Sequence, residues 1–397
     1  MTNRTGTRGG SIRETGRAAA RPMKSSGRWL LWMAASIALA FLLAGCPATG
    51  LPVDPAPPPE QDFMEEGDFI YTERPEDCME DELYDEEEQL CYVIVYCDED
   101  GNCDDGSDSL LDNLFGMVDE LLTGVAGEDF ENVAELEENT LVTYRVQGNQ
   151  IVEPEFAAVT DDLRAYQEDI QAQQRIWVYF AQLIPLAQRE NLTRYVVFTD
   201  GADEVLAFVT QETDDPTHWL LAVDIADSGS PEDLTFTLIH EFAHLLTLNN
   251  DQVPADRKLA LEPDNQALYE QAAAACLSYF PGEGCSRPNS YINRFYQRFW
   301  ADIYDEWLEV SDLEDEEARA EAIAVFYDEN RDRFVSEYAA SGPEEDIAES
   351  FAFFVLKPKP TGDTIAEQKI LFFYDFPELV NLRAEINGRL YSRLRRR

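Results

Sequence analysis

The spacing of hydrophobic and polar positions changes midway along the 397-residue chain. Up to about residue 225, short apolar stretches bounded by turn residues predict β-strands. After Ser230, apolar residues recur every three or four positions and predict helices to the end of the chain. Strands followed by helices predict an α+β fold, and no internal repeat is evident in the sequence.

The elements predicted from this spacing have definite bounds. The strands are predicted as a pair over 141–151, turned at Gly148-Asn149, and at 195–198, 205–210 and 219–225. The helices are predicted at 110–125, 161–184, 232–248, 266–279, 290–309, 315–340, 344–356 and 376–393. Pro185 is expected to end the second of these helices, because proline cannot continue one.

The first 46 residues have the layout of a bacterial export signal. Seven basic residues precede an apolar run from Trp29 to Leu43, which ends in Leu43-Ala44-Gly45-Cys46. This ending resembles the lipobox of bacterial lipoproteins, which implies that Cys46 is lipidated and becomes the first mature residue. The alternative is a transmembrane helix, but the apolar run of 15 residues is shorter than the roughly 20 that span a bilayer. Met23 is an alternative start to Met1.

Changes in composition along the chain divide it into five predicted segments. The predicted segments are a lipoprotein signal peptide at 1–46, a proline-rich linker at 47–62, an acidic cysteine-rich module at 63–108, a connecting segment at 109–156 and the catalytic domain at 157–397. The predicted location is the bacterial cell envelope, where the lipid on Cys46 would hold the protein to a membrane outside the cytoplasm.

The net charge narrows the range of partners. The chain has 79 acidic and 30 basic residues, a formal net charge of −49. Residues 1–45 contain seven of the basic residues and one acidic residue, so the remaining chain has 78 against 23, a net charge of −55. Nucleic acid is not expected as a partner, because a polyanion would be repelled. The charge instead predicts a solvated surface with divalent cations as counterions.

Six cysteines follow Cys46, and an even number in an exported chain predicts three disulfides. They are Cys78, Cys91, Cys97, Cys103, Cys276 and Cys285. The last two are near neighbours and are expected to close a small loop, while the first four can pair with one another in three ways. Zinc binding by the first four thiols is the alternative, but they include no Cys-x-x-Cys pair and the compartment is oxidising.

A calcium site is a further candidate within the acidic module. Asp98, Asp100, Asn102 and Asp104 alternate around Gly101, so their oxygens could coordinate Ca²⁺. The glutamate at the twelfth position of an EF-hand loop is missing. An ordinary acidic turn is therefore the alternative to a calcium site.

A His-Glu-Phe-Ala-His segment carries the main candidate chemistry. His240 and His244 are four residues apart on the predicted helix 232–248, so their imidazoles project from one face and can share a tetrahedral metal. Glu241 then lies beside the metal and can act as general base on a water whose pKa the metal has lowered. Ser230-Pro231-Glu232 supplies a helix start that supports this placement. The alternative is a helix that buries two ordinary histidines.

A catalytic zinc site needs a third protein ligand and an open position. The chain has three histidines, and the remaining one, His218, lies upstream of the motif, so a carboxylate is expected as the third ligand. On the helix predicted at 344–356, Glu345 and Glu349 are four residues apart on one face. One can bind zinc while the other accepts the second ring N–H of a ligating histidine. Glu344 is a further candidate ligand, and a solvated acidic face is the alternative.

These motifs resemble the gluzincin branch of the zincin metallopeptidases, and more closely the catalytic domain of the anthrax lethal factor family. The resemblance covers residues 237–246 and 338–354. It implies a zincin-like fold, with a small sheet and motif helix followed by a mostly helical part. It also implies Zn²⁺ as the cofactor, Glu345 as the third ligand, Glu349 as the carboxylate behind a ligating histidine, and Tyr338 as an oxyanion donor. About one hundred residues separate the two motifs, more than in lethal factor, so no substrate specificity is implied.

The function expected from these features is zinc-dependent hydrolysis of extracytoplasmic protein or peptide bonds, with Glu241 as general base. One alternative is a catalytically silent binding or structural lipoprotein that retains the fold. Another is hydrolysis of an amide in the cell wall, which the same metal chemistry would permit.

Overall fold

The computed structural model describes residues 74–79, 82–86, 88–93, 96–97, 103–104, 136, 139–201, 205–263, 265–313 and 315–395. The export signal with Cys46, the linker and the helix predicted at 110–125 lie outside these residues. So does the candidate calcium loop, apart from the backbone of Asp104.

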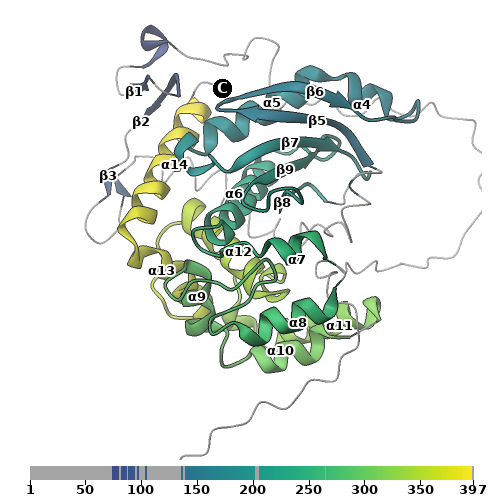
Figure 1. Ribbon diagram of the computed structural model, residues 1–397. Coiled ribbons are helices and arrows are strands. Elements are labelled where there is room, and N and C mark those ends of the chain that lie inside the picture. Colours follow the sequence, from purple (N-terminus) through teal and green to yellow (C-terminus); the bar gives the residue numbers. More distant parts are fainter. Residues whose placement is uncertain are drawn as a thin grey trace, which may run out of the picture.

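A five-stranded mixed sheet forms one side of the molecule (Figure 1). Its strands are β5 (Thr140–Gln147), β6 (Gln150–Phe156), β7 (Leu192–Phe198), β8 (Ala207–Gln211) and β9 (Trp219–Asp224). Their order in the sheet is β6-β5-β7-β9-β8, in which β7 and β9 are parallel and the other pairs are antiparallel. The strand β8 is therefore an edge strand.

The strand predictions are confirmed in type; the hairpin and β7 are longer than predicted, and β8 and β9 are each one residue shorter. The pair predicted over 141–151 is the hairpin of β5 and β6, which turns at Gly148 and Asn149 as expected. Gly148 has a φ of 62°, a conformation that glycine adopts without strain. Both strands belong to the sheet and precede residue 157, so the sheet begins earlier in the chain than the predicted start of the catalytic domain.

Helices make up most of the chain after β9, as the spacing predicted. Before β9, the described residues form α4 (Arg164–Glu168) and α5 (Ile170–Leu183). The later ones are α6 (Pro231–Leu248), α7 (Arg257–Leu261), α8 (Gln266–Ala275), α9 (Tyr291–Phe299), α10 (Tyr304–Ser311), α11 (Glu316–Glu329), α12 (Pro343–Leu356), α13 (Ile365–Phe372) and α14 (Pro377–Arg395). The α+β prediction is confirmed.

Four of the predicted helices are shorter than expected or divided, and one of them, predicted at 266–279, ends at Ala275. The helix predicted at 161–184 breaks at Asp169, whose carboxylate caps α5 by accepting from Ala172 N. The helix predicted at 290–309 is two helices that meet around Trp300. The helix predicted at 315–340 ends at Asn330, whose side chain donates to Phe326 O. Side-chain caps at Asp169 and Asn330 interrupt or end two of these helices although the apolar spacing continues through them. The helices α7 and α13 were not predicted.

The helix α6 lies at the centre of the core, between the sheet and α12 (Figure 1). Leu238 and Phe242 of α6 are fully buried, and so are Ile347 and Phe351 of α12. The rings of Phe242 and Phe351 pack edge to face with centroids 6.0 Å apart. This packing fixes the faces that the two helices turn toward each other.

The acidic module is a small unit beside the C-terminal helix. It contains the 3-10 turn η1 (Pro75–Asp77) and the strands β1 (Glu82–Asp85), β2 (Leu90–Val93), β3 (Tyr96–Cys97) and β4 (Cys103–Asp104). The strand β2 packs against α14, where Val93 N donates to Ser392 Oγ at 3.0 Å. Glu88 of the module pairs with Arg389 of α14.

Two of the predicted disulfides are present, Cys78–Cys91 and Cys276–Cys285. The second closes the small loop that the sequence predicted. The backbones of Cys97 and Cys103 face each other across β3 and β4, but their side chains lie outside the described residues.

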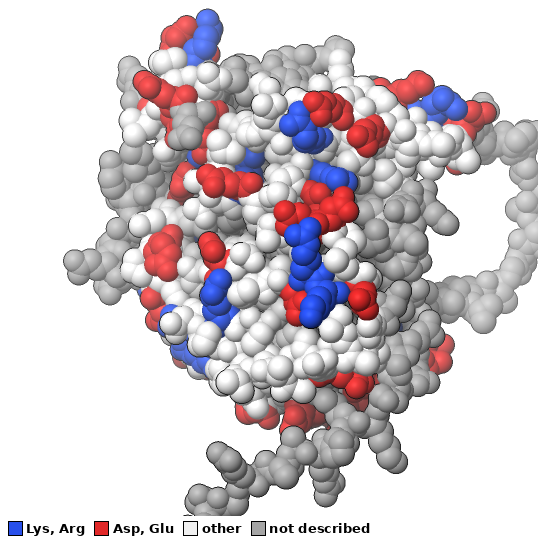
Figure 2. All heavy atoms as spheres, in the orientation of Figure 1, with Lys and Arg blue, Asp and Glu red and all other residues white. Residues whose placement is uncertain are grey.

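The surface charge is mixed on the face shown in Figure 2, where basic side chains lie next to acidic ones. Exposed ion pairs such as Arg145 with Glu153 occur among the described residues. The excess of acidic residues is therefore not gathered into one patch on the described part of this face. Among the helices that the structure describes, none is both long and apolar enough to cross a bilayer.

Candidate metal centre

The helix α6 holds His240 and His244 on its face toward α12. It begins at Pro231, directly after Ser230, whose side chain caps the helix by accepting from Asp233 N at 3.3 Å. The two imidazole rings are one turn apart with centroids at 4.8 Å. Both side chains are buried, at 5% and 6% exposure. The spacing predicted from the sequence therefore places two imidazoles together inside the molecule.

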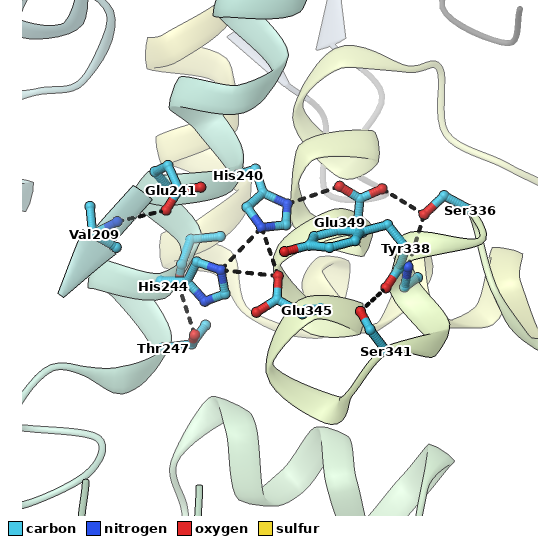
Figure 3. Close-up of polar contacts among 12 residues, drawn as sticks. Val209, His240, Glu241, His244, Thr247, Ser336, Tyr338, Ser341, Glu345 and Glu349 are labelled. Carbon is cyan, nitrogen blue, oxygen red and sulfur yellow. Dashed lines mark hydrogen bonds and ion pairs between the residues drawn. The ribbon is translucent and has the colours of Figure 1, made fainter. Parts of the chain in front are cut away.

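The helix α12 brings Glu345 and Glu349 against the same point (Figure 3). Glu345 Oε2 lies 3.1 Å from His240 Nε2 and 3.5 Å from His244 Nε2. The two Nε2 atoms are 3.0 Å apart. On the other side of the ring, His240 Nδ1 lies 2.9 Å from Glu349 Oε1. Two ring nitrogens and one oxygen of Glu345 thus converge, and the carboxylate of Glu349 contacts the other ring nitrogen of His240.

These residues fit a metal ion, and the donor set is compatible with zinc. A tetrahedral zinc with Zn–N bonds of about 2.0–2.1 Å needs its ligand atoms about 3.3 Å apart, close to the separations found here. Glu345 is 4% exposed, and its Oε1 atom has no hydrogen-bond partner among the described residues. Two imidazole nitrogens that face each other also need a proton or a cation between them, because lone pairs repel. The site can therefore accept a proton or a metal ion.

The electrostatic field of the centre favours a cation. Burial alone would lower the pKa of His240, but hydrogen bonds with Glu345 and Glu349 outweigh it and raise that pKa well above its usual range. Burial would raise the pKa of Glu345, but the charges of His244 and His240 hold it well below its usual range. Both pKa shifts indicate that positive charge is favoured between His240 and Glu345.

Glu241 lies within the same group but points to a different neighbour. His240, Glu241 and His244 form a cluster whose ligand atoms lie within 4.8 Å of one another, so Glu241 could itself be counted among the metal-binding residues. Its Oε2 atom, however, accepts from Val209 N of the edge strand β8 at 3.0 Å. Glu345 Oε2 lies 3.1 Å and 3.5 Å from the two ring nitrogens, whereas Glu241 Oε2 is held by a backbone donor, so Glu345 is the better candidate for the third ligand. Burial raises the pKa of Glu241 to about 8.

Tyr338 lies in the short turn η4 (Tyr338–Ala340), directly before α12. Its ring is 5.7 Å from the ring of His240, centroid to centroid. Ser336, two residues earlier, donates to Glu349 Oε2 at 2.7 Å and accepts from Ala339 N at 3.0 Å. Ser336 thus ties the turn to the carboxylate behind His240. The sequence analysis did not identify it, because a lone serine in a turn has no distinctive spacing.

The other candidates do not join the centre. Glu344 Oε1 accepts from Tyr279 OH at 2.7 Å instead of facing the histidines. His218 lies in the turn before β9, with Nδ1 3.8 Å from Asp215 Oδ2.

A second group of side chains, which the sequence analysis did not identify, could also hold a metal ion. Asp200, Asp224 and Asp227 lie together where β7 and β9 end. Asp224 is fully buried, and its carboxylate accepts from the backbone N–H groups of Asp200 and Ala226. Backbone donors thus already hold this carboxylate.

Comparisons with protein-family models, curated proteins and solved structures find no match to the chain. The functional argument therefore depends on the residues and their geometry.

Proposed function

We propose that the protein is a zinc-dependent peptidase in which His240, His244 and Glu345 hold the metal. The observation that supports this most is the convergence of two imidazole nitrogens and a carboxylate oxygen at 3.0–3.5 Å in a buried place. Glu241 stands next to them with a raised pKa. A purely structural zinc site needs no such base, so its presence favours catalysis.

Each residue of the centre has a role in this proposal. When bound, zinc lowers the pKa of a water molecule and polarises the carbonyl of the scissile bond. Glu241 takes a proton from the attacking water and passes it to the leaving amine. A carboxylate suits both steps, because it can accept a proton and return it.

The surrounding residues position these groups. Glu349 accepts the Nδ1–H of His240, which directs the Nε2 lone pair toward the metal position. Ser336 holds Glu349 by a hydrogen bond to its other oxygen. Tyr338 is proposed to donate its hydroxyl to the oxyanion that develops on the substrate carbonyl.

The proposed substrates are extracytoplasmic proteins or peptides, and the proposed location is the cell envelope, with the lipid on Cys46 as the anchor. A silent binding or structural lipoprotein and an enzyme that cleaves an amide of the cell wall are the competing functions. Both would retain the metal centre, so zinc content alone does not separate them from a peptidase.

The test is a cleavage assay on the purified parent protein and on Glu241→Gln, with synthetic peptide mixtures and purified cell wall as substrates. We expect peptide cleavage by the parent and a loss of about 10²- to 10⁴-fold in Glu241→Gln at unchanged zinc content. Glu232→Gln is the matched control, since it removes one charge from the first turn of the same helix. Zinc binding without any cleavage would favour the silent lipoprotein, and cleavage of cell wall alone would favour the amidase.

A further inference from the structure

A lysine and an aspartate are buried together one residue away from a candidate metal ligand. Lys369 of α13 and Asp346 of α12 are both 0% exposed, and Lys369 Nζ lies 2.5 Å from Asp346 Oδ2. The same oxygen accepts from Trp300 Nε1 at 2.7 Å. Asp346 directly follows Glu345 in the sequence. One carboxylate of α12 is thus held by side chains from two other parts of the chain.

The surroundings of Lys369 are aromatic. Its Nζ lies 4.0 Å from the ring centroid of Phe334 and 5.7 Å from that of Trp300. Phe334 belongs to the segment that continues through Ser336 to Tyr338. The same lysine therefore contacts α12 and the segment that leads to it.

Stability alone does not explain why a charged pair is buried at this place. Two charges lose their hydration on burial, and apolar side chains of similar volume are often as stable or more stable. The neighbouring rings would accept such side chains. An ion pair and a hydrogen bond differ from apolar packing because they require a definite distance and direction. The contacts of Asp346 are therefore suited to fixing an orientation.

The orientation that they fix is the rotation of α12 about its axis. Successive side chains of a helix point about 100° apart, so the direction of Asp346 determines that of Glu345. A rotation of about 20° moves a group about 5 Å from the axis by about 2 Å. Metal-ligand distances hold to within about 0.2 Å. A small rotation would therefore remove Glu345 Oε2 from its place 3.1 Å and 3.5 Å from the histidine nitrogens.

We propose that Asp346, held by Lys369 and Trp300, is a positioning residue that sets the rotation of α12 and so directs Glu345 to the metal. The proposal rests on the proposed metal centre and adds to it three residues that do not touch the metal. Glu349 lies on the same helix face as Glu345, so the same contacts direct it to His240 Nδ1.

The first test replaces the whole polar group by apolar side chains in the full chain. The apolar variant combines Asp346→Leu, Lys369→Met and Trp300→Phe. We expect its midpoint of urea denaturation to stay near that of the parent, and its zinc affinity to fall by about 10- to 100-fold. The matched control combines Arg389→Met with Glu88→Gln, which removes a buried ion pair at the module, and keeps the parent zinc affinity.

The second test follows the orientation of α12 without metal. The chain has three histidines, so nitrogen NMR of the metal-free protein labelled in its histidine rings gives few signals. The ring nitrogens of His240 contact Glu345 and Glu349, and their chemical shifts report those contacts. We expect the apolar variant to shift the His240 signals and to leave those of His218, which lies outside the centre.

The outcomes separate the inference from the proposed function. A folded apolar variant with the zinc affinity of the parent overturns the positioning role, and so does an equal loss of affinity in the control. If circular dichroism shows that the apolar variant does not fold, Trp300→Phe alone takes its place. It removes one donor to Asp346, and unchanged zinc affinity and His240 signals in it overturn the proposal.

A parent that binds no zinc overturns the proposed function. The histidine spectrum then still decides the inference, since it needs no metal. Unchanged His240 signals in the apolar variant overturn the positioning role, and shifted signals support it.

Discussion

The molecule buries charged side chains at two interfaces in opposite ways. Where the acidic module meets α14, Arg389 Nη2 and Nη1 lie 2.7 Å and 3.0 Å from the two oxygens of Glu88, so each charge has its partner. Between α6 and α12, His240, His244 and Glu345 converge without any lysine or arginine among them. At the first interface the chain supplies both charges, whereas the second has no lysine or arginine and can take up a proton or a metal ion. A buried ion pair and a candidate metal centre therefore differ in whether a lysine or arginine supplies the positive charge.

The helix α12 carries both arrangements at adjacent positions. Glu345 faces the histidines, while Asp346 pairs with the buried Lys369 at 2.5 Å and accepts from Trp300 Nε1 at 2.7 Å. The Asp346 contacts fix the rotation of α12 about its axis. Glu345 and Glu349 are thereby turned toward α6 before any metal binds.

The largest expected effect breaks the complete pair at the module. Arg389→Met leaves Glu88 buried without its cation, so we expect the free energy of unfolding to fall by about 3–5 kcal/mol. Adding Glu88→Gln should restore part of that loss, because the unpaired charge is gone. Urea denaturation measures both changes. Zinc content should equal that of the parent in both variants, and a loss of zinc would contradict the separation of the two interfaces.

A pH titration of stability examines a third way of burying a carboxylate, by hydrogen-bond donors without a lysine or arginine. Burial raises the pKa of Asp224 from 3.8 to about 8, so its neutral form is favoured in the folded state. The resulting stability is present at about pH 4 and is lost as the pH rises through about 8.

The parent therefore becomes less stable relative to Asp224→Asn between about pH 5.5 and 7.5, by up to about 1.4 kcal/mol per pH unit. Urea denaturation of both proteins at several pH values measures this difference. A difference that stays constant across the window would show that burial of Asp224 does not govern its ionisation.

The smallest expected effect concerns the support of the metal centre. Ser336→Ala removes the hydrogen bond to Glu349 Oε2, so the carboxylate behind His240 is held less firmly. We expect zinc affinity to fall by about 10- to 100-fold, as is usual for such supporting groups. A competition titration with a zinc indicator measures it. Ser341→Ala is the matched control, because that hydroxyl donates to Tyr338 O and does not touch a carboxylate. Equal losses in both variants would contradict the role of Ser336.

Much of the fold could be predicted from the sequence, because the spacing of apolar residues reports the buried face of each element. The hairpin at Gly148-Asn149 and the helices α6 and α12 follow from local pattern alone. The breaks at Asp169 and Asn330 did not, because a side-chain cap ends a helix whose apolar spacing continues. The pairing of β5 with β7 is also nonlocal, so the sequence predicted the hairpin but not that it joins the same sheet as β7.

The residues of the candidate site also divide into those that the sequence predicted and those that it did not. The spacing of four residues places His240 with His244, and Glu345 with Glu349, on single helix faces, so sequence alone can propose them. Ser336 could not be found this way, since its hydrogen bond to Glu349 depends on how the segment before α12 packs against that helix. A lone serine in a turn has no spacing that marks it.

Zinc stoichiometry by elemental analysis tests the central claim most directly. The parent is compared with His244→Ala and Glu345→Ala, and Arg389→Met serves as a control for a buried charge outside the centre. We predict one zinc per chain in the parent and in Arg389→Met, and loss or strong weakening in both other variants. A parent without zinc would contradict the metal centre, and full zinc retention in Glu345→Ala would contradict the assignment of its third ligand.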